Sequence, residues 1–150
     1  MNAGPGVVVD ASVALKWFFP DEEFVREAGE LLRLFRNDEL QIRAPALIRY
    51  EVAQALETGR RQGRITDEEA SKDLGELLSL DIHAREDSYD LLAGAQSVAR
   101  QIGSSVYDGV YVAYAEMLGF SFVTGDEALL RLLEEYPVVA RRLDELMSLP

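Results

Sequence analysis

The stretch Val7-Val8-Val9-Asp10-Ala11-Ser12 predicts a buried strand that passes directly into a helix. Three consecutive β-branched residues are typical of a short strand covered on both faces. Asp10 ends this run, and a helix-like stretch from Ser12 to Phe19 follows at once. In an open α/β sheet, ligands bind in the crevice at the carboxyl ends of the strands. We therefore expect Asp10 to be the first acid of a site at that edge.

The rest of the chain alternates between strand-like and helix-like segments. Strands are expected near 41–44 and 120–123, with weaker candidates at 80–83 and 138–139. Helices are expected over 21–35, 46–61, 66–78, 88–102, 108–118 and 126–135. No linker, repeat or low-complexity segment interrupts this pattern. The alternation predicts one α/β domain over residues 1–150, with a parallel sheet and helices on both sides.

Composition excludes several classes of site. The chain has no cysteine, which excludes disulfides and thiolate chemistry, and His83 is its only histidine, which excludes a histidine-rich zinc site. The N-terminus has no basic start and no apolar segment, and no apolar run is long enough to span a membrane. We therefore expect a cytoplasmic protein with no membrane association.

The formal net charge of −12 argues against a large basic surface for nucleic acid. It does not exclude a nuclease, because acids clustered around metal ions present a cationic centre to a phosphate. The basic residues gather in two groups, which we interpret as solvated helix faces. One group is Arg60, Arg61 and Arg64, and the other is Arg141 and Arg142.

Four acids stand where a simple pattern would not place them. Asp10 ends the first strand, and Glu51 lies on an apolar helix stripe between Ile48 and Ala55. Asp108 begins the most apolar helix, and Asp126 follows the strand at 120–123. Taken singly, Asp10, Asp108 and Asp126 are equally well explained as turn or helix-capping residues. Glu51 is harder to dismiss, because a carboxylate on a core-facing stripe needs a partner.

Taken together, these acids predict a divalent metal site. If the strands are parallel, Asp10 and Asp126 lie at the same sheet edge, and Asp108 joins them by the same winding. Carboxylates gathered in one place need cations or raised pKa values. Oxygen ligands without histidine or cysteine suit Mg²⁺ or Mn²⁺. Ser12 and Thr124, each two residues from an acid, are expected to support the site by hydrogen bonding or to cap helices.

At this point the sequence resembles the PIN-domain ribonucleases. The resemblance lies in four acidic motifs that appear in the family's order: Val7–Ser12, Glu51–Leu56, Tyr107–Glu116 and Val123–Glu127. The stretch Leu15–Glu22 is similar to the VapC-type toxins of toxin–antitoxin pairs. Small departures are Gln54, where the family often has asparagine, and Gly109 and Gly125, where alanine is frequent.

The resemblance implies a sheet of four or five parallel strands and endonucleolytic hydrolysis of RNA that depends on Mg²⁺ or Mn²⁺. It implies that Asp10, Glu51, Asp108 and Asp126 form the catalytic, metal-binding cluster, with Ser12 and Thr124 as supporting polar residues. It also implies a homodimer and a cognate antitoxin, for which the aromatic segment Trp17–Phe19 is a candidate contact or, alternatively, core.

Two other functions remain open. The first is a non-catalytic module that binds metal or RNA. The second is a phosphotransferase with Asp10 as nucleophile, although Ser12 stands where such enzymes have a second aspartate.

Overall fold

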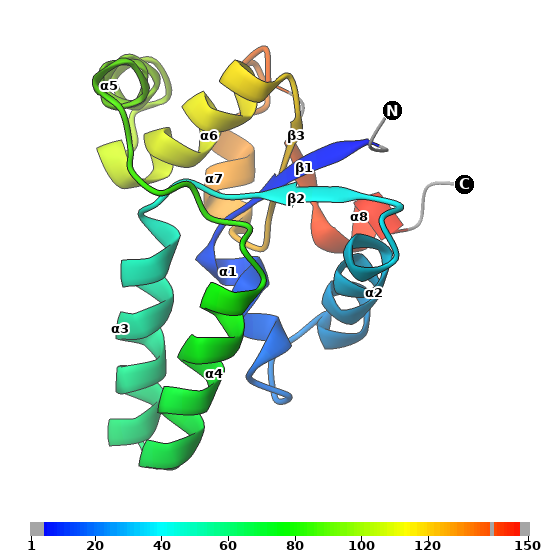
Figure 1. Ribbon diagram of the computed structural model, residues 1–150. Helices are drawn as coiled ribbons and strands as arrows, with labels where there is room; N and C mark the ends of the chain where they lie inside the picture. The colour runs from blue at the N-terminus through cyan, green and yellow to red at the C-terminus, as the bar shows by residue number, and fades with distance from the viewer. Residues whose placement is uncertain (1–4, 139, 148–150) are drawn as a thin grey trace.

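The central sheet has four parallel strands in the computed structural model, which describes residues 5–138 and 140–147 (Figure 1). The strand order is β2-β1-β3-β4, and all three pairings are parallel. The strands are β1 (Gly6–Val9), β2 (Gln41–Arg43), β3 (Ser121–Thr124) and β4 (Ala140–Arg142). The predicted parallel α/β architecture is therefore confirmed.

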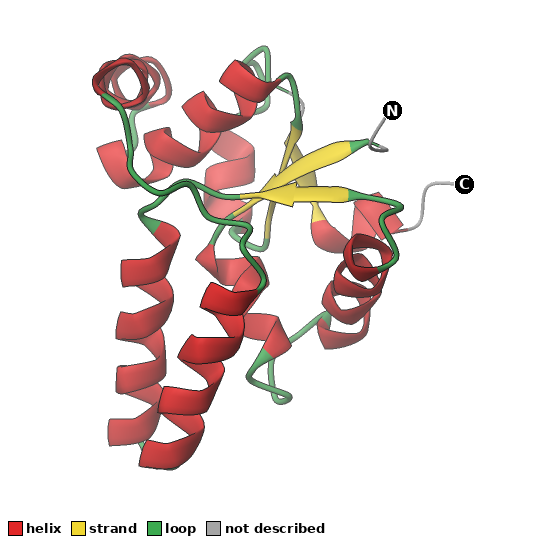
Figure 2. Ribbon diagram, in the orientation of Figure 1, coloured by secondary structure: helices red, strands yellow, loops and turns green. Residues whose placement is uncertain are grey.

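Helices connect these strands and flank the sheet (Figure 2). They are α1 (Ala11–Ala14), the 3₁₀ helix η1 (Leu15–Trp17), α2 (Val25–Arg36), α3 (Ile48–Arg61), α4 (Asp67–Ser79), α5 (Tyr89–Ile102), α6 (Val106–Leu118), α7 (Glu127–Leu132) and α8 (Leu143–Met147). Figure 1 shows α5 and α6 on one side of the sheet, α1 and α2 on the other, and α3 with α4 projecting as a hairpin. Within the described residues, no helix is long and apolar enough to cross a membrane.

The register of the sheet positions the predicted site. Val9, the last residue of β1, lies opposite Val123 of β3. The residue that follows each of these valines is polar, Asp10 after β1 and Thr124 at the end of β3. Val9, Val123 and their neighbours in the two strands are buried. Asp10 and Thr124 therefore lie at the carboxyl ends of the two central, tightly packed strands.

The helix that we expected from Asp21 begins later, at Val25. The prediction for this start is wrong because Phe24 takes a left-handed conformation, with φ of 59°, and interrupts the helix. Asp21 instead pairs with Arg64 at 2.7 Å, which ties this loop to the end of α3.

Two weaker strand candidates also differ. Segment 80–83 forms a single bridge, between His83 and Ala44, rather than a strand. The buried Nδ1 of His83 has no hydrogen-bond partner among the described residues. Of the candidate at 138–139, Val139 lies outside the described residues, and the strand there, β4, begins at Ala140.

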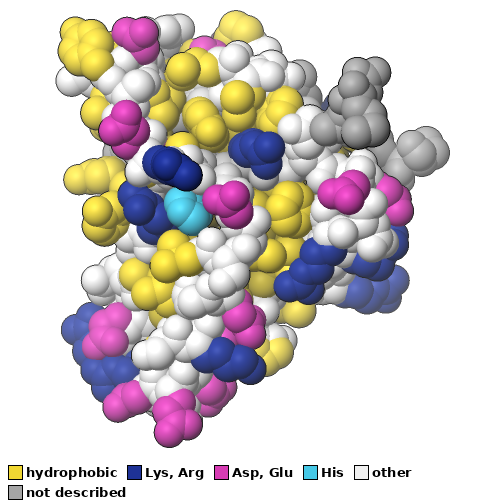
Figure 3. Space-filling view, viewed as in Figure 1, with side chains coloured by type: hydrophobic (Ala, Val, Ile, Leu, Met, Phe, Trp, Pro, Cys, Tyr) yellow, Lys and Arg dark blue, Asp and Glu magenta, His cyan; other side chains and the backbone are white. Residues whose placement is uncertain are grey.

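The basic clusters lie on a helix end and on a strand. Arg60 pairs with Glu57 and Asp67, and basic and acidic side chains are interleaved over the far end of the α3–α4 hairpin (Figure 3). Arg141 and Arg142 lie on β4, which corrects the expected helix face, and Arg142 pairs with Glu127 and Asp144. Much of this positive charge is thus neutralised within the chain.

The packing of α6 on α5 depends on Gly109. A Cβ at this position would lie 2.3 Å from the backbone oxygen of Ala95, a contact that real Cβ atoms do not make. We expect Gly109→Ala to lower the free energy of unfolding by about 1–3 kcal/mol, because backbone atoms on α5 must move. Urea denaturation followed by circular dichroism measures this change.

Gly94→Ala is the matched control on the facing helix. A Cβ there would lie 3.5 Å from Ala113 Cβ, an ordinary contact. Alanine is a better helix former than glycine by about 1 kcal/mol, so this variant should be as stable as the wild type or more so. Equal effects of the two substitutions would contradict the proposed close approach at Gly109.

Candidate functional site

Asp10 lies at the carboxyl end of β1 and is 8% exposed. It is the N-cap of α1, and its Oδ1 accepts from the backbone N–H of Val13 at 3.3 Å. Ser12 Oγ donates to Oδ1 at 2.5 Å, and Thr124 Oγ1 donates to Oδ2 at 2.5 Å. Both carboxylate oxygens are therefore held by hydroxyl groups, one from α1 and one from β3.

The same two hydroxyls organise the turn after β3. Ser12 Oγ accepts from the N–H of Gly125 at 2.8 Å, and Thr124 Oγ1 accepts from the N–H of Asp126 at 3.0 Å. Asp126 is exposed and caps α7, where its Oδ1 accepts from Leu129 at 3.1 Å. The ends of β1 and β3 are thus joined by one hydrogen-bond network that connects Asp10 to Asp126 through Thr124.

Burial raises the pKa of Asp10 to about 6. The hydrogen bonds from Ser12, Thr124 and Val13 favour the ionised form and oppose this shift, whereas the negative charge of Glu51 adds to it. A carboxylate so placed gains more from a bound cation than an exposed one, because its negative charge is poorly solvated.

Glu51 lies on the half-buried face of α3, as its position on the apolar stripe predicts. Its partner is the phenol of Tyr111, which donates a hydrogen bond to Glu51 Oε1. Burial raises the pKa of Glu51, and the charge of Asp108 raises it further. Glu51 is therefore electrostatically coupled both to Asp10 and to Asp108.

Asp108 lies in the first turn of α6, but it is not the helix cap. Ser105 is the N-cap, and its Oγ accepts from the N–H of Asp108 at 3.1 Å. The capping interpretation of Asp108 is therefore wrong, whereas for Asp10 and Asp126 it describes a real bond. Ser104 Oγ donates to Asp108 Oδ2 at 2.5 Å and holds this half-buried carboxylate in place.

The candidate residues are brought together to different degrees. Asp10, Ser12 and Thr124 are bonded directly, Asp126 joins through Thr124, and Glu51 and Asp108 interact with the group electrostatically. Over residues 5–138 and 140–147, no three acidic or histidine side chains form a ready-made metal cluster. The four acids Asp10, Glu51, Asp108 and Asp126 are called the acidic edge below. Only Asp10 is buried among them, and the four do not form a closed cage.

Sequence reasoning missed Tyr111 and Ser104 as partners of the acids. Tyr111 is three residues after Asp108 and Ser104 four before it, so both were visible as neighbours of an unusual acid. Tyr111 is 3% exposed and stacks on Phe122, with ring centroids 6.3 Å apart. It links the acid on α3 to the centre of the sheet.

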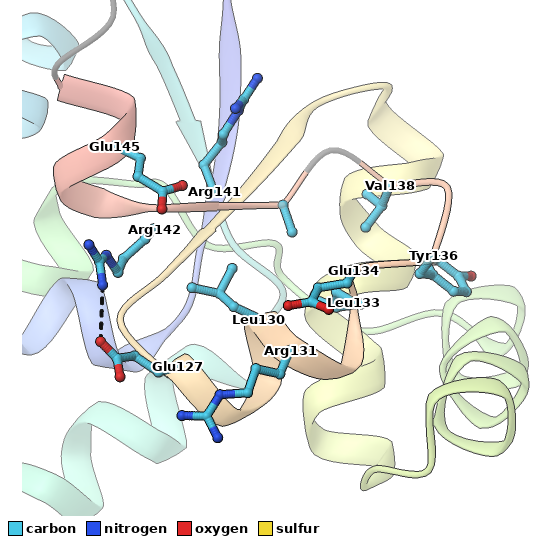
Figure 4. A pocket seen from close by; sticks show the side chains of 11 residues that line it. Glu127, Leu130, Arg131, Leu133, Glu134, Tyr136, Val138, Arg141, Arg142 and Glu145 are labelled. Carbon is cyan, nitrogen blue, oxygen red and sulfur yellow. Dashed lines mark hydrogen bonds and ion pairs between the residues drawn. The ribbon is translucent and has the colours of Figure 1, made fainter.

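A polar cleft near this edge is lined by other residues. It has a volume of about 580 Å³ between α7, β4 and α8, with the ion pair of Arg142 and Glu127 at one end (Figure 4). Among its described lining residues there is none of the six candidate site residues. The cleft therefore uses other side chains than the candidate site, although Glu127, which lines it, directly follows Asp126.

Tyr111→Phe tests the support of Glu51. The variant keeps the ring packing but removes the phenol that bonds the carboxylate, and a hydrogen bond to a charged group contributes about 1.5–3 kcal/mol. We expect the free energy of unfolding at neutral pH to fall by about that amount. Chemical denaturation measures it.

Tyr114→Phe, on the same helix, is the control, because the Tyr114 hydroxyl has no side-chain bond to any of the six candidate residues. It should change stability little. If Tyr111→Phe destabilises the chain equally in a Glu51→Met background, where residue 51 offers the phenol no oxygen, the effect does not come from this bond.

Comparison with known proteins adds an independent finding. Residues 7–134 match the family described as the PIN domain. The chain is 31% identical over 134 residues to Ribonuclease VapC3 of Pyrobaculum aerophilum, covering 89% of this chain and 96% of that protein.

Solved structures agree with this match. The crystal structure of PAE2754 from Pyrobaculum aerophilum superimposes with a TM-score of 0.70 and 26% identity, covering 96% of this chain and 95% of that one. VapBC2 from Rickettsia felis, solved bound to a DNA fragment from its promoter, shares the fold with a TM-score of 0.66 at 12% identity, covering 91% and 98% of the two chains.

Proposed function

Because the chain belongs to the PIN-domain family, we propose that it is a metal-dependent endoribonuclease and the toxin of a toxin–antitoxin pair. The observation that carries this proposal is the buried Asp10, fixed by Ser12 and Thr124 at the sheet edge and coupled to Glu51. The similarity to a ribonuclease over most of both chains supports the substrate class. We propose that this activity is cytoplasmic.

The acids fit a hard divalent cation, and we propose Mg²⁺, with Mn²⁺ as a substitute. The donors are carboxylate and hydroxyl oxygens, and Mg²⁺ is usually bound by one or two carboxylates and several waters. An edge that has no preformed cluster of three acids among the described residues is compatible with that mode of binding. Of the four acids Asp10, Glu51, Asp108 and Asp126, one or two would hold the ion directly and the others through its waters.

The proposed reaction is hydrolysis of an RNA phosphodiester bond. The ion, when bound, would lower the pKa of water and offset the phosphate charge. Ser12 and Thr124 keep Asp10 in one orientation, and Tyr111 does the same for Glu51. We assign no separate protein base.

Incubation of a total RNA pool with the purified chain tests this function. The incubation is carried out in Mg²⁺, in Mn²⁺ and in a chelator. Discrete cuts that need metal support the proposal. A wild-type chain that leaves all RNA intact under every metal condition, with antitoxin shown to be absent, contradicts it.

A non-catalytic RNA- or metal-binding module is the second candidate, because Asp10 fixed by Ser12 and Thr124 would bind an ion equally well in a chain that does not cleave RNA. The same incubation distinguishes the two. Tight RNA binding with no cleavage at any metal concentration indicates the binding module.

We further propose an antitoxin whose arginine or lysine side chains enter the acidic edge. Opposite charges favour such a contact, and the cation would compete with the metal. Trp17 and Phe18 are half-buried and line a small cleft of about 150 Å³ with Leu32 and Leu80, whereas Phe19 is core. Trp17 and Phe18 are therefore the better candidates for a partner contact.

The activity of the purified complex tests the competition between the antitoxin cation and the metal. A complex that keeps full nuclease activity and metal affinity would contradict it.

A homodimer is proposed through the apolar groove between α3 and the start of α6. It has a volume of about 420 Å³ and is lined by Leu47, Tyr50, Glu51, Gln54, Ala55 and Tyr107. Tyr50 and Tyr107 are 69% and 64% exposed, and exposed aromatic side chains are enriched at interfaces. Sedimentation of the purified chain tests the dimer.

A further inference from the structure

Lys16 is a nearly buried cation beside the acidic edge. It lies in η1, four residues after Ser12, and is 9% exposed. A Cβ built at Gly125 would lie 3.3 Å from Ser12 Oγ and 3.5 Å from Lys16 Cε. The end of the lysine stem therefore packs against the turn that joins Thr124 to Asp126.

Lys16 has no partner in the described part of the chain. It forms no ion pair or hydrogen bond there, whereas the other lysine, Lys72, lies 3.8 Å from Glu76. Its ammonium is not among the fully buried unpaired polar atoms, so the nitrogen still reaches solvent beside the turn. The protein thus holds an ammonium beside Thr124 and Asp126 that has no ion-pair partner among the described residues.

We propose that Lys16 binds a phosphate of the RNA chain at this edge. The inference rests on the proposed ribonuclease function. A chain of net charge −12 with acids at its site repels a polyanion, and an unpaired ammonium offers a point charge for a phosphate oxygen. The buried stem limits the motion of the ammonium, so the phosphate is held at a fixed place relative to Asp10 and Asp126.

The salt dependence of RNA binding tests this role. The binding of a labelled oligouridylate to the full chain is measured at several salt concentrations, with chelator present. Lys16→Met keeps an apolar stem and removes the charge. We expect its logarithmic salt slope to fall by about 0.7, the value for one phosphate contact on a single strand. Cleavage with metal should show KM raised about tenfold, with kcat changed less. Lys16→Arg should restore most of the affinity.

Lys72→Gln is the matched control, because it also removes one lysine charge from an exposed position on α4. It should leave the slope and KM unchanged. If Lys16→Met has the wild-type slope and KM while the wild type cleaves RNA, the role of Lys16 is overturned and the nuclease stands. If the wild type neither binds nor cleaves RNA, the proposed function fails and this inference with it.

A second measurement needs no variant. The chain has only two lysines, so acetylation of each can be followed by mass spectrometry. Saturating RNA should slow acetylation of Lys16 and leave Lys72 unchanged. Equal rates at Lys16 with and without bound RNA would overturn the proposal, even if Lys16→Met failed to fold.

Discussion

Asp10→Asn is expected to lower RNA cleavage by at least about 10³-fold, which corresponds to about 4 kcal/mol of transition-state stabilisation. Asparagine keeps the shape of the side chain and leaves Ser12 and Thr124 with a hydrogen-bonding neighbour. It cannot supply the negative charge that holds a divalent ion. Single-turnover cleavage of a defined RNA fragment measures the loss.

Asp38→Asn is the control for Asp10→Asn. Asp38 is exposed and has a left-handed backbone conformation that asparagine also tolerates. The Asp38→Asn variant loses the same negative charge at a position away from the site, and it should cleave RNA at the wild-type rate. Equal activity of folded Asp10→Asn and the wild type would refute the catalytic role of the acidic edge.

The second large effect is on stability without metal. The pKa of Asp10 is about 6 in the folded chain, compared with 3.8 for a fully solvated aspartate, so the folded chain binds the proton more tightly than the unfolded chain. The unfolded state therefore releases this proton first as pH rises, and stability falls from pH about 4 until the pH has passed about 6. The expected loss is about 3 kcal/mol.

Urea denaturation in chelator across this pH range, compared with Asp10→Asn, isolates the contribution of one residue. The variant lacks the titrating group, so the wild type should lose stability relative to the variant as the pH rises. Added Mg²⁺ should restore stability to the wild type at neutral pH and not to the variant. A difference that stays constant with pH would show that burial does not disfavour the charge of Asp10.

The sheet edge was predictable because its determinants are local. A run of valines ends directly at Asp10, and Thr124 and Asp126 follow a second apolar run, so parallel pairing alone brings them together. The family resemblance was also predictable, because four short motifs carry it, and the comparisons confirm it. The roles of the six site residues stay a prediction that the experiments above test.

What the sequence did not reveal depends on contacts between distant segments. The bond from Tyr111 to Glu51 spans 60 residues, and no local pattern specifies it. The late start of α2 depends on the left-handed Phe24 and on the pairing of Asp21 with Arg64, 43 residues away. Gly109 looked like a small departure from a family pattern, and only the approach of α5 explains it.

The most direct test of the acidic metal site is binding of Mn²⁺ to the purified chain without RNA, measured as the loss of the free-ion signal in electron paramagnetic resonance. We expect saturable binding to the wild type and to Asp38→Asn, and at least about 10-fold weaker binding to Asp10→Asn. Equal binding by Asp10→Asn and the wild type, or no saturable binding by either, would contradict the claim that these acids form a metal site.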